Sequence, residues 1–405
     1  MDLKDKAKSI FLYAVDSVKP KNVIQKEHLF KKPFYLFGSG KASIESAKRV
    51  EEIAFDNILD GFVVCNYKED LKKCEVFKSD HPIPTKNSIK AAEILIKKLS
   101  SLEKSDRFIY LLSGGSSALV EKTAPPIALG EFQYLTKLLL LRGASIWEIN
   151  AVRKHLSLVK GGRLAKLTDA KGKVLVISDV LGDSLEAIGS APFYFDKSTF
   201  LDVRDILIKY EIWDEIESVK EVVLKGIKGE EKETLKNEKK NIEHIIVANN
   251  NKALTVALKK CKEFGFDANI LKKPLTTDVK EAAKFIIKLA RENKSTIFGS
   301  ECTVEVKGDG RGGRNQELAL RVLKLMKKDD RFVFLSGGSD GIDGNSDAAG
   351  AVVDYSLKER AGEEIIDKYL ENNDSNSFFK RFGGVIETSF TGTNVADIGI
   401  ILKED

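Results

Sequence analysis

Short apolar runs alternate with amphipathic segments along the whole chain. The runs cover residues 34–37, 61–67, 107–113, 173–180, 244–250 and 331–338. Between them lie stretches with apolar residues at helical spacing, such as SIKAAEILIKKL (88–99) and TDVKEAAKFIIKLARE (277–292). Continuous apolar strands separated by helices are typical of a parallel sheet that helices cover on both faces. The pattern therefore predicts the α/β class.

One segment interrupts this alternation. From Asp214 to Lys240 the chain is dominated by Lys and Glu, contains two glycines and has no strand-like run. A chain of 405 residues also exceeds the size at which a single hydrophobic core keeps growing. We therefore expect two α/β domains, residues 1–235 and 236–405, joined by this segment. The alternative is a polar loop within one domain.

Composition narrows the class of protein. The chain is 42% hydrophobic and 31% charged, as in soluble globular proteins, and its net charge of +5 comes from 66 basic and 61 acidic residues that are interspersed. No basic block indicates nucleic-acid binding, and no apolar stretch reaches the ~20 residues that span a bilayer. The N-terminus is unlike a signal peptide, and the four cysteines show no spacing typical of zinc or disulfides. We expect a cytoplasmic protein with neither a nucleic-acid nor a membrane partner; a homodimer is compatible with the sequence but not specified by it.

The first apolar run ends in a glycine turn, GSGK (38–41). A dinucleotide-binding fingerprint would need a third glycine where Ser43 stands. A P-loop would need a glycine at Tyr35 and a hydroxyl residue at Ala42. Neither motif is complete, but a strand, a tight turn and a helix start remain, and such joints bind anions through backbone N–H groups. Lys41 follows this turn, where a solvated surface lysine is the simpler interpretation.

A second glycine turn, LLSGGSS (111–117), is repeated as LSGGSD (335–340) in the other half of the chain. Both follow apolar runs, so both are expected at the carboxyl edge of a sheet, where open α/β sheets bind ligands. A nucleophilic serine would need G-x-S-x-G, which neither turn supplies. We therefore expect Ser113, Ser116 and Ser117 to donate hydroxyl hydrogen bonds to phosphate oxygens.

Charged residues beside other predicted turns suggest further chemistry. Arg153 and His155 flank the apolar stripe of a helical segment, and an arginine there suits a carboxylate; a solvated basic helix face is the alternative. Asp179 directly follows a strand and is suited to hold magnesium or accept a proton, or else caps a turn. GDGRGGRNQELAL (308–320) places arginines in a glycine loop that opens a helix. Arginine at such a position stabilises developing phosphoryl charge.

Together these motifs resemble the glycerate 2-kinase family, the class II glycerate kinases with a MOFRL domain. The matching stretches are GSGKAS (38–43), SDHPIPT (79–85), LLSGGSSAL (111–119), NAVRKHLSLVKGGRLA (150–165), VLVISDVLGDSLEAIGSAP (174–192), GDGRGGRNQELAL (308–320), GGSDGIDGNSDAAGA (337–351) and TGTNVADI (391–398). They extend over nearly the whole chain, and their combination is specific.

The resemblance implies ATP-dependent phosphorylation of D-glycerate at its 2-hydroxyl, with a divalent cation such as Mg²⁺. It also implies a Rossmann-like N-terminal α/β/α domain, a smaller C-terminal α/β domain and an active site in the cleft between them. The family's catalytic lysine and arginine fall on Lys41 and Arg314, and we add Asp179 as metal ligand or base. The expected nucleotide contacts are Ser113, Gly114, Gly115, Ser116, Ser117, Asp183 and Asn315, and the expected substrate contacts are Gly38, Ser39, Gly40, Arg153 and His155.

Two other functions remain open at this stage. Relatives have been labelled hydroxypyruvate reductases, and an NAD(P)-dependent enzyme would need an acidic residue ~20 positions after the glycine turn, where Asp56 and Asp60 stand. A non-enzymatic protein that binds sugar phosphates would also use serine-rich turns, but it would leave Arg311 and Arg314 unexplained.

Overall fold

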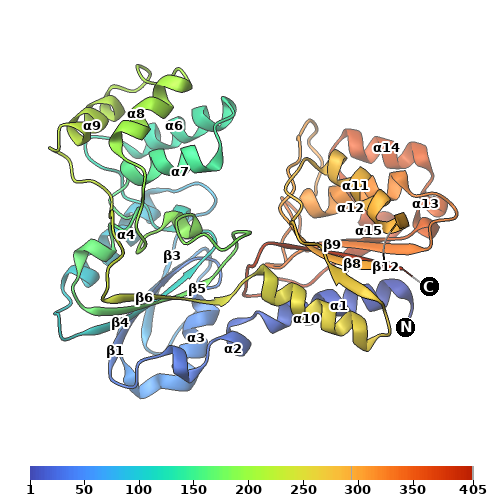
Figure 1. Ribbon diagram of the computed structural model, residues 1–405, viewed down its shortest axis with the longest axis horizontal. Helices are drawn as coiled ribbons and strands as arrows, with labels where there is room; N and C mark the ends of the chain where they lie inside the picture. Colours follow the sequence, from blue (N-terminus) through green and yellow to red (C-terminus); the bar gives the residue numbers. More distant parts are fainter. Residues whose placement is uncertain (293, 404–405) are drawn as a thin grey trace. The chain divides into compact units, whose positions relative to one another are not determined.

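The computed structural model describes residues 1–292 and 294–403, which form two compact units (Figure 1). We call the first, residues 24–177 and 183–247, the parallel-sheet unit. The second, residues 1–23, 178–182 and 248–405 as far as they are described, is the mixed-sheet unit. The α/β class predicted from the sequence is confirmed in both.

The parallel-sheet unit is built on six strands in the order β3-β2-β1-β4-β5-β6. The strands are β1 (Phe34–Ser39), β2 (Ile58–Cys65), β3 (Cys74–Lys78), β4 (Arg107–Ser113), β5 (Lys171–Ile177) and β6 (Ile242–Ala248). Neighbours from β3 to β5 pair in parallel. This is the order of doubly wound nucleotide-binding sheets, in which the chain reverses direction across the sheet between β1 and β4.

Successive residues along the central strands of this sheet are buried, because helices cover both of its faces. In α3, for example, Ile44, Ala47 and Val50 repeat at helical spacing and form a buried stripe. Four further helices share a core of their own above the sheet (Figure 1). The helices of the unit are α3 (Ser43–Ala54), α4 (Lys86–Ser100), α5 (Ser116–Leu119), α6 (Leu129–Leu141), α7 (Ile146–His155), α8 (Phe200–Lys209) and α9 (Glu217–Ile227).

The mixed-sheet unit contains six strands in the order β11-β10-β9-β12-β8-β7. They are β7 (Ala268–Ile270), β8 (Ser295–Ser300), β9 (Phe332–Gly338), β10 (Gly350–Val353), β11 (Val385–Ile386) and β12 (Asp397–Lys403). The prediction of a parallel sheet is wrong here, because β12 inserts antiparallel to both β9 and β8 and only β7 pairs in parallel with β8. As a result, the start of β12 lies beside the carboxyl ends of β8 and β9.

Helices lie on both faces of the mixed sheet as well. Figure 1 shows α1 and α10 on one face and α11, α12 and their neighbours on the other. The second group forms a large buried core around α11 and α12. The helices of this unit are α1 (Leu3–Ser17), α2 (Pro20–Val23), α10 (Asn250–Glu263), α11 (Val279–Glu292), α12 (Arg314–Leu325), α13 (Tyr355–Ala361), α14 (Glu363–Glu371) and α15 (Ser375–Phe382).

The structure divides the chain differently from the expected boundary between residues 235 and 236. The N-terminal helix α1 belongs to the mixed-sheet unit, where buried Phe11 lies against Gly337 so closely that a Cβ at Gly337 would be 2.7 Å from its ring. Strand β6, beyond the expected boundary, completes the parallel sheet. Contacts between residues far apart in the chain decide which unit α1 and β6 belong to. No local pattern in the sequence predicts these contacts.

The Lys/Glu-rich segment is also not the connection between units. Its residues after α9 form a loop inside the parallel-sheet unit, with Thr234 only 2% exposed. The Leu235 N–H donates to the Gly161 carbonyl at 2.8 Å, and the Leu235 carbonyl accepts from the Asp196 N–H at 2.7 Å. The expected linker is therefore a packed loop, as the alternative interpretation had it.

Candidate functional site

The glycine turns after β1 and β4 lie side by side at the point where the strand order of the parallel sheet reverses. Strand β1 continues to β2 on one side and β4 continues to β5 on the other, so the two connections leave the sheet in opposite directions. Such switch points open a crevice at the carboxyl edge of the sheet, which is where α/β proteins bind ligands. Residues 38–41 and 113–117 are thus neighbours in space.

Hydrogen bonds join the two turns. The Lys41 N–H donates to the Gly114 carbonyl at 2.9 Å, and the Ala42 N–H donates to Ser113 Oγ at 3.0 Å. Ser39 Oγ lies within hydrogen-bond distance of both Ser116 Oγ and the Tyr110 hydroxyl. The two turns therefore form one structure whose parts are positioned by each other.

Two glycines make this close approach possible. Gly40 has φ +127°, and a Cβ there would lie 2.2 Å from Ser113 Oγ. Gly115 has φ +85°, and a Cβ there would lie 3.0 Å from the His81 ring and 3.4 Å from Lys41 Cγ. The side chains of Lys41 and His81 therefore both pass beside Gly115. Positions 40 and 115 therefore favour glycine, both for its backbone conformation and for the space that a Cβ would take.

His81 was not among the residues selected from the sequence. It lies in SDHPIPT, just beyond β3, and the carboxyl end of that parallel strand brings it to the same edge of the sheet as Lys41. The order of the strands, rather than any motif around His81, reveals its position. A signal existed only in the stretch SDHPIPT, which formed part of the family resemblance.

The serines of the second turn are placed differently from one another. Ser113, Ser116 and Ser39 are at most 3% exposed, and their hydroxyls take part in the bonds that join the turns. These bonds stabilise the turns and engage the hydroxyls that Ser113 and Ser116 were expected to present to a phosphate. Gly115 and Ser117 are partly exposed.

Two cationic side chains, Lys160 and Arg153, donate hydrogen bonds to the backbone of the Ser113–Ser117 turn. Lys160 Nζ donates to the Ser117 carbonyl at 2.7 Å and pairs with Glu121 at 2.8 Å, and burial lowers the pKa of Lys160 to about 8. Arg153 Nη2 donates to the same Ser117 carbonyl at 3.4 Å. Arg153 Nε is buried and makes no hydrogen bond to the described residues. Arg153, an expected substrate contact, thus lies against the Ser113–Ser117 turn.

His155, an expected substrate contact, is engaged by groups of the protein. Its ring is fully buried, with Nδ1 2.8 Å from the Ala151 carbonyl and Nε2 3.0 Å from Glu233 Oε2. The edge of the ring packs against Phe200. Both nitrogens are occupied by protein acceptors, so His155 anchors the loop that carries Glu233.

The two expected aspartates after β5 belong to different units. Asp179 lies in the segment 178–182, which is part of the mixed-sheet unit, whereas Asp183 belongs to the parallel-sheet unit and has φ +58°. Ser178 N–H donates to the Ala248 carbonyl at 2.9 Å and so ties the Asp179 segment to the start of α10. Among residues 1–292 and 294–403, no three His, Cys, Asp or Glu side chains are grouped to hold a metal ion.

In the mixed-sheet unit, Arg314 is the first residue of α12. Its Nε donates to Asp397 Oδ2 at 2.6 Å, and its Nη1 lies 3.5 Å from Glu301 Oε1. Burial alone would lower the pKa of Arg314, but the Asp397 carboxylate outweighs it and raises the pKa. The Arg314 side chain is about one third exposed.

The N-terminus of α12 is capped from within the protein. Asp343 Oδ1 accepts from the Asn315 N–H at 3.0 Å, and Asp343 Oδ2 accepts from the Gln316 N–H at 2.8 Å. Asn315 is buried, and its side chain accepts from Ser336 Oγ at 2.7 Å. These contacts engage the side chain of Asn315, the expected nucleotide contact, and the two N–H groups that follow Arg314.

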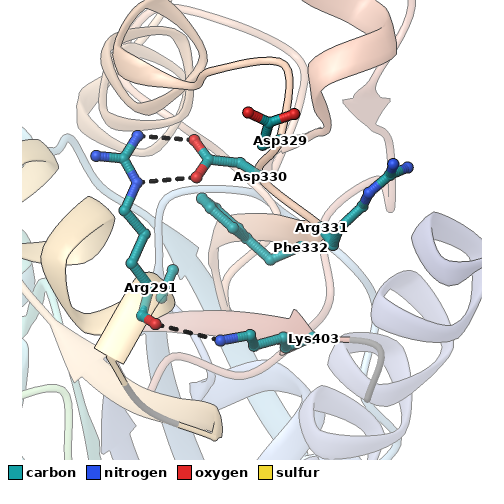
Figure 2. Close-up of a pocket in the computed structure, with 7 residues that line it drawn as sticks. Arg291, Asp329, Asp330, Arg331, Phe332 and Lys403 are labelled. Atoms are coloured by element: carbon teal, nitrogen blue, oxygen red, sulfur yellow. Dashed lines mark hydrogen bonds and ion pairs between the residues drawn. The ribbon is translucent and has the colours of Figure 1, made fainter.

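A separate pocket of about 560 Å³ lies at the other end of the mixed sheet, near Phe332 and Lys403. Figure 2 shows that Arg291 and Asp330, which both line this pocket, are paired directly, with Nε–Oδ1 and Nη2–Oδ2 both at 2.8 Å. The charge of Arg291 is thereby neutralised by a bidentate partner. This pocket lies at the edge of the sheet opposite Asp397, so we do not assign it to the candidate site.

Comparisons with known proteins agree on one family. Residues 6–225 match a domain of unknown function (DUF4147), and residues 294–397 match the MOFRL family. The chain is 38% identical to a glycerate 2-kinase of Pyrococcus horikoshii, over 96% of this chain and 92% of that protein. A crystal structure of a glycerate kinase from Thermotoga maritima superposes with a TM-score of 0.88 at 37% identity, covering 99% of both chains.

One relative carries a different name. A putative hydroxypyruvate reductase of Agrobacterium vitis is 34% identical over 97% of this chain and 93% of that protein. No helix of the described residues is long and apolar enough to cross a membrane. From the sequence matches and the shared fold, the chain belongs to the glycerate kinase family that carries the MOFRL domain.

Proposed function

We propose that the protein transfers the γ-phosphoryl group of ATP to the 2-hydroxyl of D-glycerate. The hydroxyl oxygen bonds to the γ-phosphorus, the bond from that phosphorus to the β,γ-bridging oxygen breaks, and the hydroxyl proton is released. The products are 2-phosphoglycerate and ADP. The names of the relatives support the substrate and the reaction class.

The observation that carries this proposal is the pair of joined turns at the switch point, with Lys41 beside Gly115. A lysine ammonium at such an edge neutralises phosphate charge, and phosphoryl transfer depends mainly on positioning and charge compensation. In this proposal the positive charges of Lys41 and Arg314 are each assigned to compensate phosphoryl charge. Arg153 binds the substrate carboxylate, for which its planar fork is suited.

We assign the remaining nucleotide and substrate contacts to groups that are exposed or that belong to the backbone of the turns. The backbone of Gly114, Gly115 and Ser117 binds nucleotide phosphates, and Asp183, which belongs to the same unit, is assigned as a further nucleotide contact. Residues 38–40 shape the substrate side of the same turn. Ser113, Ser116, Asn315 and His155 leave the set of direct contacts because their polar atoms are already engaged.

A divalent cation such as Mg²⁺ fits this arrangement without a cage of protein ligands. Mg²⁺ keeps several waters and is usually held by one or two carboxylates plus substrate phosphates, which agrees with the lack of a three-residue metal group in the described residues. Asp179 is the carboxylate that we propose to hold it. When bound, the ion would neutralise charge on the β- and γ-phosphates.

Replacement of the two cations tests the proposal. We expect Lys41→Ala and Arg314→Ala each to lower the kcat of glycerate-dependent ADP release by about 10³-fold or more. Lys98→Ala is the matched control, since Lys98 pairs with Asp60 on an exposed surface, and it should retain wild-type turnover. Near wild-type kcat in both test variants would refute the assignment.

The rival reductase lacks support at the residues it needs. A dinucleotide-binding sheet places its ribose-binding acid at the carboxyl end of β2, but Asp60 lies near the amino end of β2 and pairs with Lys98 at 2.6 Å. Asp56 precedes β2 altogether. Ser43, at the third glycine position, is buried and donates to the Gly40 carbonyl. Oxidation of NADH by hydroxypyruvate without ATP would reverse this choice.

A further inference from the structure

We propose that Asp397 is a positioning residue that holds the Arg314 guanidinium in the orientation needed for phosphoryl transfer. The inference rests on the proposed function, because it assigns a role to a partner of Arg314. Asp397 touches Arg314 directly through the 2.6 Å bond from Nε. It acts on the reaction only through that arginine.

The backbone of Arg314 is fixed by close contact between two glycine loops. A Cβ at Gly344 would lie 2.1 Å from the Gly312 carbonyl, and a Cβ at Gly313 would lie 2.4 Å from Asp343. Asp343 also caps the two N–H groups that follow Arg314. The helix start therefore has little freedom, and the direction of the arginine depends on its side chain alone.

That side chain is held by carboxylates at the ends of two neighbouring strands. Asp397 begins the central strand β12 and pairs with Ser300, the last residue of β8; Glu301 is the next residue. The Asp397 carbonyl accepts from Asn250 Nδ2 at 3.1 Å, which fixes the strand start. The antiparallel insertion of β12 thus brings Asp397 and Glu301 to one arginine.

The bond geometry leaves one edge of the guanidinium for a ligand. Asp397 takes Nε and Glu301 takes Nη1, whereas Nη2 has no part in either bond. Asp397 has 6% of its side chain exposed and Glu301 has 49%. The buried carboxylate is therefore the rigid anchor, and the arginine presents a prearranged cation, which is the form that stabilises developing charge most effectively.

Loss of the anchor should reduce turnover and leave substrate binding almost unchanged. An arginine released from Asp397 regains rotamer freedom, and a displacement of about 1 Å can lower a rate by about 10²-fold. We expect Asp397→Asn to lower kcat for ADP release by roughly 10²-fold, with KM for D-glycerate within about 3-fold. Asp397→Glu keeps the charge one methylene further out and should recover part of the lost kcat.

Asp330→Asn provides a matched control. Asp330 is also a buried partner of an arginine in the mixed-sheet unit, with 7% of its side chain exposed, but it lies at the opposite end of β9. This variant should retain wild-type kcat. Circular dichroism and thermal melting must show that each variant is folded; if Asp397→Asn does not fold, Asp397→Glu carries the test.

A double-mutant cycle separates positioning from a merely structural role. In an Arg314→Ala background, Asp397→Asn should cause no further loss of kcat, because the group that it orients is gone. A folded Asp397→Asn with wild-type kcat would overturn this inference alone. Full additivity in the cycle would do the same, and Asp397→Glu supplies that cycle if Asp397→Asn does not fold. Wild-type kcat of Arg314→Ala would instead overturn the role that the proposed function gives to Arg314.

Discussion

Gly40→Ala is the sharpest test of the joined turns. A Cβ at this position would lie 2.2 Å from Ser113 Oγ and 2.5 Å from the Ser113 carbonyl, so the second turn must move. The φ of +127° adds backbone strain of about 1–3 kcal/mol. Loss of the bond from Ala42 N–H to Ser113 Oγ costs about 1 kcal/mol, and overpacking costs about 1–3 kcal/mol.

Gly143→Ala isolates the effect of space from that of conformation. Gly143 also has a positive φ, +76°, but a Cβ there meets no atom within 4 Å. It should cost only the strain of about 1–2 kcal/mol. The entropy that alanine removes from the unfolded chain is common to both variants and cancels.

The assay is thermal unfolding followed by circular dichroism, together with ADP release. The lost bond and the overpacking leave a difference of about 2–4 kcal/mol between the variants. Each kcal/mol shifts the Tm of a unit of this size by about 2–4 °C, so Gly40→Ala should melt roughly 4–16 °C below Gly143→Ala. Its kcat should fall about 10²-fold because the Lys41 backbone moves. Equal Tm and equal kcat in the two variants would refute the contact between the turns.

Two further predictions concern buried polar groups. Burial lowers the pKa of His244 from 6.5 to about 4, so the unfolded chain binds the proton first and the stability present above pH 6.5 is lost as the pH falls toward 4. The loss in free energy of unfolding is about 3 kcal/mol. His244→Phe should remove this pH dependence of the unfolding free energy, measured by urea titration at several pH values, and an unchanged pH dependence would exclude His244 as its cause. Glu233→Ala leaves His155 Nε2 without its acceptor, which should lower stability by about 1–3 kcal/mol and speed tryptic cleavage at Lys236. The exposed Glu230→Ala is its control, and equal cleavage rates in the two variants would contradict the anchoring role of Glu233.

The sequence predicted what depends on local pattern. Strand β4 was located at residues 107–113, as observed, and the apolar run before Lys41 became β1. The turn at residues 113–117 was correctly expected at a carboxyl edge, because the strand–turn–helix pattern is local and the parallel order follows from alternating helices.

The features that the sequence does not indicate depend on partners far away in the chain. His155 carries no sign that Glu233 will occupy its ring, and Asn315 none that Asp343 will cap the N–H groups around it. Strand β12 was not expected between β9 and β8, so the approach of Asp397 to Arg314 could not be foreseen. Burial of a polar side chain is decided by such pairings, which only the folded structure shows.

The central claim concerns the reaction itself, and phosphorus NMR tests it most directly. The protein is incubated with ATP, magnesium and D-glycerate, and the products are identified by their phosphorus resonances. The account predicts ADP and 2-phosphoglycerate in equal amounts. A product phosphorylated at the 3-hydroxyl, or no glycerate-dependent phosphoryl transfer at all, would contradict it.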